Sequence, residues 1–148
     1  MRGLTKKIVP VLMLLVSVVG THVVKAQSDK IEGVWLNEEK DAKIQIYKGR
    51  DGLFYGKIIW LKEPVENGAP KLDKKNPHED KRKQQILGLI ILRKFEKDGK
   101  TYDDGTIYDP TNGKTYDATI NYKGNKLDLR GYVGISLFGR TTTWERTQ

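Results

Sequence analysis

The sequence predicts an all-β protein, an antiparallel barrel or sandwich of about eight strands. Short segments rich in β-branched and aromatic residues alternate with turns that contain Gly, Asn, Asp or Pro. No segment after residue 26 keeps a helical period over a helix-length window. Closure into a barrel would remove exposed sheet edges, and an eight-stranded barrel is just wide enough to be filled by side chains or to hold one small ligand.

The first three predicted strands are the segments 31–37, 43–48 and 53–61. In the second of these, Ile44 and Ile46 share one face while polar residues share the other, which is typical of a sheet with one side in water. The third is apolar on both faces. It is therefore either a central strand or a strand covered by the segment that follows it.

A long loop is predicted around residues 62–85, where prolines and charges interrupt the strand pattern. Its Lys-rich part, residues 71–83, carries six basic and three acidic side chains. One helical turn is expected after Pro77, with Asn76 as its N-cap. Loops of this length in compact domains are usually functional lids or disordered. The part from residue 64 to residue 85 is a candidate lid at the barrel mouth.

The remaining predicted strands are 86–95, 106–108, 114–122, 126–132 and 139–146. Residues 109–113 (DPTNG) and 123–125 (KGN) separate successive strands and have the composition of tight turns. Both connections therefore predict hairpins between antiparallel neighbours.

The amino terminus has the pattern of a secretory signal peptide over residues 1–26. Three basic residues precede an uncharged run from residue 8 to residue 20, and Val24-Lys25-Ala26 follows as a cleavage site. A membrane anchor would need about 20 apolar residues, and Pro10 interrupts this shorter run. We therefore expect a single domain over residues 27–148, exported to the periplasm or secreted, with no stable membrane anchor.

The net charge bears on which partners the protein can bind, and the cysteine content bears on what stabilises its fold. Residues 1–26 contain four of the 27 basic residues and no acidic one, so the exported chain has 23 basic against 19 acidic residues, a net charge of about +4. This mixed charge, without a basic stripe or a recognition motif, argues against nucleic-acid binding. The chain has no Cys, so no disulfide stabilises the fold and the core must do so.

An ordered set of motifs resembles a known family. The set is Gly33-x-Trp35, Gly56-Lys57-Ile58, Trp60-Leu61-Lys62-Glu63-Pro64, Asp73-x-x-Asn76-Pro77 with Arg82, Leu87-Gly88-Leu89, Gly105-Thr106-Ile107-Tyr108-Asp109-Pro110, Asn112-Gly113-Lys114-Thr115-Tyr116, Arg130-Gly131-Tyr132, Gly139-Arg140 and Trp144-x-Arg146. Together these motifs span residues 31–146 and resemble the exported bacterial proteins of the DUF2147 family. The resemblance implies a lipocalin-like, or calycin, barrel, and it implies a fold rather than a reaction.

The resemblance also implies two contacts. In calycins a Trp of the first strand packs beneath an Arg of the last, and Trp35 and Arg146 match those positions as a barrel-closing pair. Many relatives carry a Cys before each of the glycines matching Gly56 and Gly139, where this chain has Tyr55 and Phe138. If those relatives form a disulfide, Tyr55 and Phe138 should touch.

The usual catalytic and metal-binding constellations are missing from the sequence. The exported chain has no Cys and a single His, His78, in the charged loop. Asp103, Asp104 and Asp109 do not have the spacing of an EF-hand. We therefore predict no enzyme activity, no metal and no cofactor.

Aromatic residues on nearly every predicted strand are the candidate ligand contacts, because Tyr and Trp combine apolar area with a polar handle. An aromatic core without a cavity is the alternative interpretation. Arg130 and Arg140 would pair with a carboxylate or phosphate headgroup if they point inward. The candidate ligand-binding residues are Trp35, Tyr55, Trp60, Tyr108, Tyr116, Tyr132, Arg130, Arg140 and Trp144.

The leading functional hypothesis is an exported, non-enzymatic binding protein whose barrel holds a small hydrophobic or amphipathic molecule such as a lipid or fatty acid. The alternative is an interaction module with a solid barrel that binds an acidic partner in the cell envelope through the Lys-rich loop 71–83. Salt separates the two hypotheses, since exposed charges are screened and an apolar cavity is not.

Overall fold

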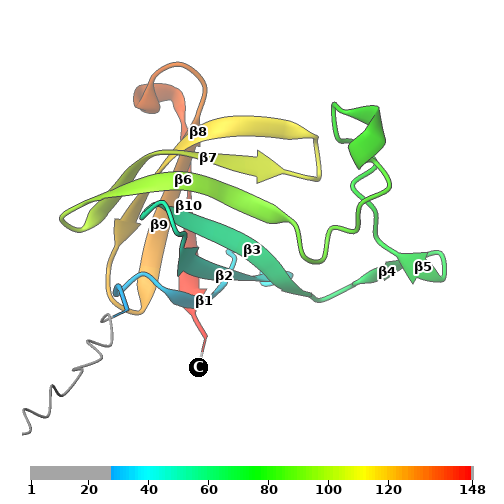
Figure 1. Cartoon of the computed structure of the whole chain (residues 1–148), viewed down its shortest axis with the longest axis horizontal. Helices are drawn as coiled ribbons and strands as arrows, with labels where there is room; N and C mark the ends of the chain where they lie inside the picture. The colour runs from blue at the N-terminus through cyan, green and yellow to red at the C-terminus, as the bar shows by residue number, and fades with distance from the viewer. Residues whose placement is uncertain (1–27, 148) are drawn as a thin grey trace, which may run out of the picture.

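Eight antiparallel strands form a closed barrel in the computed structural model, which describes residues 28–147 (Figure 1). The order around the barrel is β1-β10-β9-β8-β7-β6-β3-β2, and β1 pairs with β10 to close it. The strands are β1 (Gly33–Leu36), β2 (Ala42–Lys48), β3 (Phe54–Leu61), β6 (Ile90–Asp98), β7 (Thr101–Asp109), β8 (Lys114–Tyr122), β9 (Lys126–Tyr132) and β10 (Arg140–Arg146). The predicted all-β, eight-stranded fold is confirmed. The predicted signal peptide lies outside the described residues.

One strand is longer than its sequence suggests. The sequence predicts a strand over residues 106–108, whereas β7 begins at Thr101. Asp103 and Asp104 resemble a turn, but the register between β7 and β8 shifts between Tyr102 and Gly105, and Asp104 has a φ of 56°. A bulge of this kind lets polar residues sit within a strand. Tyr102, before the bulge, is buried in the core.

The core fills the end of the barrel that Trp35 and Arg146 close. Trp35 is fully buried, and its indole Nε1–H donates to the carbonyl of Ile31 at 2.9 Å. The expected pair is present, with Arg146 Cζ 4.2 Å from the centroid of the Trp35 ring. Gly33 has a φ of 140°, and a Cβ there would lie 2.4 Å from Arg146 Nη1. Glycine at position 33 is therefore what lets the guanidinium reach the indole.

The segment before β1 is tied to the same end of the barrel by Asp29. Its carboxyl group accepts hydrogen bonds from Lys97 and Tyr102. Burial opposes ionisation of Asp29, but these hydrogen bonds outweigh it and hold the pKa of the carboxyl below its ordinary value. The pKa of the Tyr102 phenol is raised, mainly by burial and to a smaller extent by the hydrogen bond to Asp29.

The long loop has short elements of its own. It contains the hairpin β4 (Val65–Glu66) and β5 (Ala69–Pro70) and one 3₁₀ turn, η1 (Glu79–Lys81). The helical turn expected after Pro77 is therefore present. The expected N-cap is wrong, because His78 occupies that position without a side-chain cap. Asn76 instead accepts the backbone N–H of His78 and donates to Asp73.

The contact expected between Tyr55 and Phe138 is wrong. Tyr55 lies near the β2–β3 turn and stacks on Tyr47, with ring centroids 6.0 Å apart. Phe138 lies in η2 (Ser136–Phe138), between β9 and β10 at the other end of the barrel, where its side chain is 80% exposed. The expectation relied on a possible disulfide in relatives and not on any feature of this chain.

Within residues 28–147, no helix is long and apolar enough to cross a membrane.

Candidate ligand-binding cavity

A cavity of about 1030 Å³ occupies the end of the barrel opposite the Trp35–Arg146 pair. Its buried floor and walls are apolar side chains that alternate inward along the strands. They are Ile44, Ile58, Ile91, Leu129 and Trp144. The barrel is thus packed in one half and hollow in the other, so neither a wholly filled nor a wholly empty barrel describes it.

Large and small residues on neighbouring strands explain why the cavity stops where it does. A Cβ on Gly105 of β7 would lie 2.4 Å from the Phe95 ring, so that ring fills the space which glycine leaves. Phe54 and Tyr102 pack edge to face beside it, with centroids 5.0 Å apart. Above this layer, Gly131 of β9 faces the cavity, and a Cβ there would meet nothing closer than 3.6 Å. The space beyond Gly131 stays open.

Three tyrosines stand on the upper wall of the cavity, namely Tyr108, Tyr116 and Tyr132. The Tyr108 hydroxyl donates to Asp73 at 2.6 Å, and the Tyr116 hydroxyl accepts from Asn112 at 3.0 Å. Two effects raise the pKa of the Tyr108 phenol: the larger is burial, and the smaller is the hydrogen bond to Asp73. Tyr108 is therefore a neutral hydrogen-bonding group at the cavity wall and not a base.

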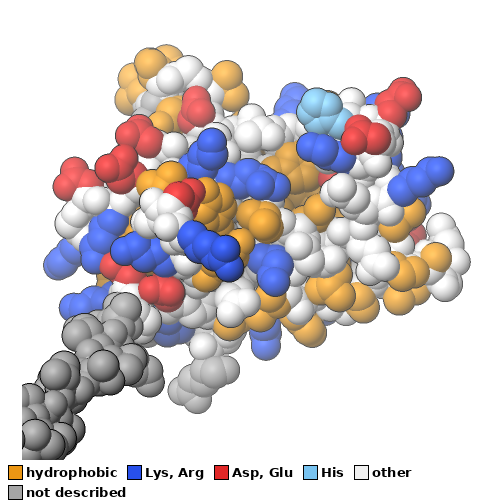
Figure 2. Space-filling view, in the orientation of Figure 1, with side chains coloured by type: hydrophobic (Ala, Val, Ile, Leu, Met, Phe, Trp, Pro, Cys, Tyr) orange, Lys and Arg blue, Asp and Glu red, His pale blue; other side chains and the backbone are white. Residues whose placement is uncertain are grey.

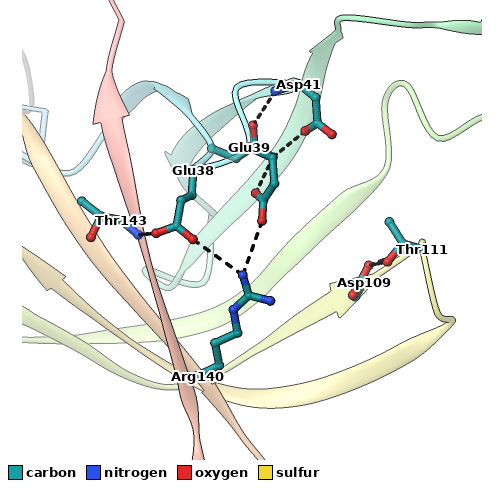
Figure 3. Close-up of polar contacts among 8 residues, drawn as sticks. Glu38, Glu39, Asp41, Asp109, Thr111, Arg140 and Thr143 are labelled. Atoms are coloured by element: carbon teal, nitrogen blue, oxygen red, sulfur yellow. Dashed lines mark hydrogen bonds and ion pairs between the residues drawn. The ribbon is translucent and has the colours of Figure 1, made fainter.

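Polar residues gather at the mouth of the cavity (Figure 3). Arg140 Nη2 lies 3.7 Å from Glu38 and 3.8 Å from Glu39. Asp109 and Thr111 lie apart from this group, and Thr111 donates to Asp109. Because Arg140 is 77% exposed at its side chain, these ion pairs hold it weakly, and a ligand carboxylate or phosphate could replace them.

The loop after β3 is held against the β7–β8 hairpin at this mouth. Asp73 is fully buried in the loop and accepts hydrogen bonds from Tyr108 and from Asn76. Lys75 Nζ donates to the carbonyl of Thr111 at 2.7 Å. A Cβ on Gly113, which has a φ of 74°, would lie only 1.9 Å from the carbonyl oxygen of Lys75. The candidate lid is therefore docked on the barrel through specific contacts.

Tyr108→Phe should loosen this docked loop. Removing the hydroxyl leaves one side of the buried Asp73 carboxyl without a donor, which should lower the free energy of unfolding by about 1–3 kcal/mol. Limited proteolysis should then cut faster between residues 71 and 85. Tyr116→Phe is the matched control, because its hydroxyl accepts only from the exposed Asn112. Equal loss of stability in both variants would show that the Tyr108–Asp73 contact does not hold the loop.

Of the nine candidate ligand-binding residues, five line the cavity and four lie elsewhere. The five are Tyr108, Tyr116, Tyr132, Arg140 and Trp144. Trp35 lies in the packed half beneath the cavity, where it meets Arg146. Tyr55 faces the outside, where its hydroxyl donates to Asp51 at 2.5 Å.

Trp60 and Arg130 also lie outside the cavity. Trp60 is on the outer face of β3, with Lys43 Nζ 5.3 Å from its ring centroid. Arg130 follows the inward Leu129, so alternation turns it outward, where it donates to Thr141 at 2.9 Å and to the carbonyl of Leu137 at 3.1 Å. It does not line the cavity in which a headgroup would lie.

Sequence reasoning missed Gly131, Ile107 and Asp73 as residues of this region. The only sequence signal for Gly131 is its place two residues after the inward-facing Leu129. Asp73 was one charge within the Lys-rich run. Nothing in the spacing of that run distinguishes a buried carboxyl from an exposed one.

A closed eight-stranded antiparallel barrel with a packed floor and an open cavity belongs to the lipocalin-like, or calycin, class. A solved structure of this class is protein HP1028 from the human pathogen Helicobacter pylori, described as belonging to the lipocalin family. The similarity has a TM-score of 0.71 and 25% sequence identity, and it covers 82% of this chain and 85% of that one. The lipocalin-like fold suggests a ligand-binding barrel.

The family is established by the sequence. Residues 33–146 match the family model described as "Uncharacterized protein conserved in bacteria (DUF2147)". This match covers most of the chain, so the protein belongs to the DUF2147 family, as its motifs predict. A comparison with curated protein sequences found no match.

Proposed function

We propose that the protein is an exported, non-enzymatic binding protein that holds one small hydrophobic or amphipathic molecule, similar to a lipid or fatty acid. The observation that carries the proposal is the cavity of about 1030 Å³, apolar at its buried end and polar at its mouth. An amphipathic molecule would place its apolar part against Ile44, Ile58 and Leu129. Its polar end would then meet the group around Arg140.

The size and composition of the cavity support binding of an organic molecule. Ligand pockets in proteins usually have volumes of roughly 300–1,000 Å³ and apolar linings with a few polar groups. Within the described part of the chain, the cavity lining contains no Cys, His or Ser. Aliphatic and tyrosine walls suit the binding and orientation of one organic molecule.

The Lys-rich loop gives less support to the alternative, an acidic envelope partner. Several of its cations have partners within the protein. Lys71 lies 3.6 Å from Glu63, Lys74 lies 2.5 Å from Glu66, and Lys75 donates to Thr111. The alternative hypothesis also assumes a barrel filled by side chains, whereas this barrel contains a cavity. Binding that weakens steeply with salt would favour the alternative.

Native mass spectrometry of the protein purified from its own cells tests the proposal. We expect the mass of a chain that begins at Gln27. We also expect a second species that is heavier by the mass of one small molecule. Extraction with organic solvent should release that molecule for identification. Repeated spectra of the ligand-free protein alone, under conditions that keep a known lipid-binding protein loaded, would contradict the proposal.

A further inference from the structure

The loop that joins β9 and β10 exposes large apolar side chains at the barrel mouth. Val133, Ile135, Leu137 and Phe138 are 74%, 57%, 76% and 80% exposed. Figure 2 shows a hydrophobic group protruding at the top of the molecule, where Figure 1 places this loop. Exposed apolar groups of this kind mark interaction sites in soluble proteins.

The same loop lacks charge. Residues 131–139 contain no Asp, Glu, Lys or Arg, although such residues make up 31% of the chain. Apart from one Ser, the tip from residue 133 to residue 138 consists of apolar residues and a glycine. The tip therefore offers few polar groups with which to recognise a protein surface, whereas an uncharged apolar tip matches the hydrocarbon boundary of a bilayer.

The position of the loop connects it to the cavity. Val133 and Phe138 line the cavity and are also exposed outside it. Apolar surface thus continues from the tip of the loop over the rim toward the buried wall at Leu129 and Trp144. Four acidic and three basic side chains line the cavity, all toward its mouth, so its charge is nearly balanced. A balanced rim suits zwitterionic headgroups and does not require an anionic surface.

We propose that the β9–β10 loop inserts into the surface of a lipid bilayer and turns the cavity mouth toward the membrane. An amphipathic molecule could then pass between bilayer and cavity along apolar surface, without crossing water. This transfer step rests on the proposed function, whereas docking of the loop does not. The shape of the feature fits a bilayer because the loop protrudes, and a second copy of the chain would need a matching hollow.

Vesicle flotation tests the docking. The probes are vesicles of phosphatidylcholine alone and vesicles of phosphatidylethanolamine with phosphatidylglycerol, mixed with the exported protein. We expect the protein to float with both kinds. The variant that combines Ile135→Asp with Leu137→Asp should bind at least about tenfold more weakly, because two apolar side chains no longer leave water. Salt should change the binding little, since the contact is apolar.

Val65→Asp is the matched control, because Val65 is 53% exposed on β4 and does not line the cavity. It should float as the parent does. Failure of the parent to float, or equal flotation of the double variant, would overturn the inference. So would a dimer, seen by light scattering, that the double substitution converts to a monomer, since a second copy would then cover the loop.

The two proposals fail separately. Neither Ile135 nor Leu137 lines the cavity, so the double variant should still take up a fluorescent fatty acid in solution. Uptake without docking would overturn the membrane inference and leave the binding function standing. Docking without uptake by any variant would overturn the binding function.

Discussion

Replacing Gly131 by Phe should weaken binding of a fluorescent fatty acid about ten- to hundredfold while the barrel stays folded. Gly131 lies on β9 with its Cα facing the cavity. A Cβ at this position would lie 3.6 Å from Ile107 Cγ2 and 3.7 Å from Tyr116 Cβ, which are ordinary contacts. Its φ is not in the left-handed region, so the backbone accepts a side chain. The added ring would occupy space that the ligand needs.

The measurement is a titration with a dansyl-labelled fatty acid, followed by its fluorescence. Forcing extra volume into an occupied site costs about 1–3 kcal/mol, so we expect the affinity to fall about ten- to hundredfold. Gly131→Ala is the matched control, because it adds only the Cβ that the structure accommodates, and it should bind as the parent does. Circular dichroism should show the same barrel in all three proteins. Unchanged binding by the Phe variant would mean that the probe lies outside the cavity.

The strands could be predicted from the sequence because their alternation is local. Ile44 and Ile46 recur at every second position of one segment, and the structure buries both. The start of β7 could not be predicted, since Asp103 and Asp104 have the composition of a turn and only the pairing with β8 shows that they continue a strand. The closing contact between β1 and β10 came from the resemblance and not from the spacing of residues.

The cavity could be predicted only in part. Residues that line the cavity and residues that fill the packed half alternate in the same way along their strands. What separates the two halves is the size of the residue on the neighbouring strand: the Phe95 ring of β6 fills the space beside Gly105 of β7, whereas Gly131 of β9 leaves its space open. These neighbours are set by the strand register, which shifts between Tyr102 and Gly105. A single sequence does not reveal them.

Trp35→Ala should lower the free energy of unfolding more than any substitution in the cavity wall. Trp35 is fully buried and touches Tyr122 edge to face, with centroids 6.3 Å apart. Removing a buried Trp side chain costs about 3–5 kcal/mol, a large share of the roughly 5–15 kcal/mol that stabilises a domain. Urea unfolding followed by circular dichroism measures this change. Trp60→Ala, on the outer face, should cost less than about 1 kcal/mol; equal costs would contradict the assigned packing.

Part of the loss at Trp35 should come from its contact with Arg146, and a double-mutant cycle isolates that part. Arg146→Ala alone is not sufficient, because the guanidinium also donates to the carbonyls of Lys30 and Glu32. These hydrogen bonds are lost whether or not the indole is present, so they cancel in the cycle. The remaining coupling between Trp35 and Arg146 should be about 0.5–2 kcal/mol. A coupling near zero would mean that Arg146 closes the barrel through backbone carbonyls alone.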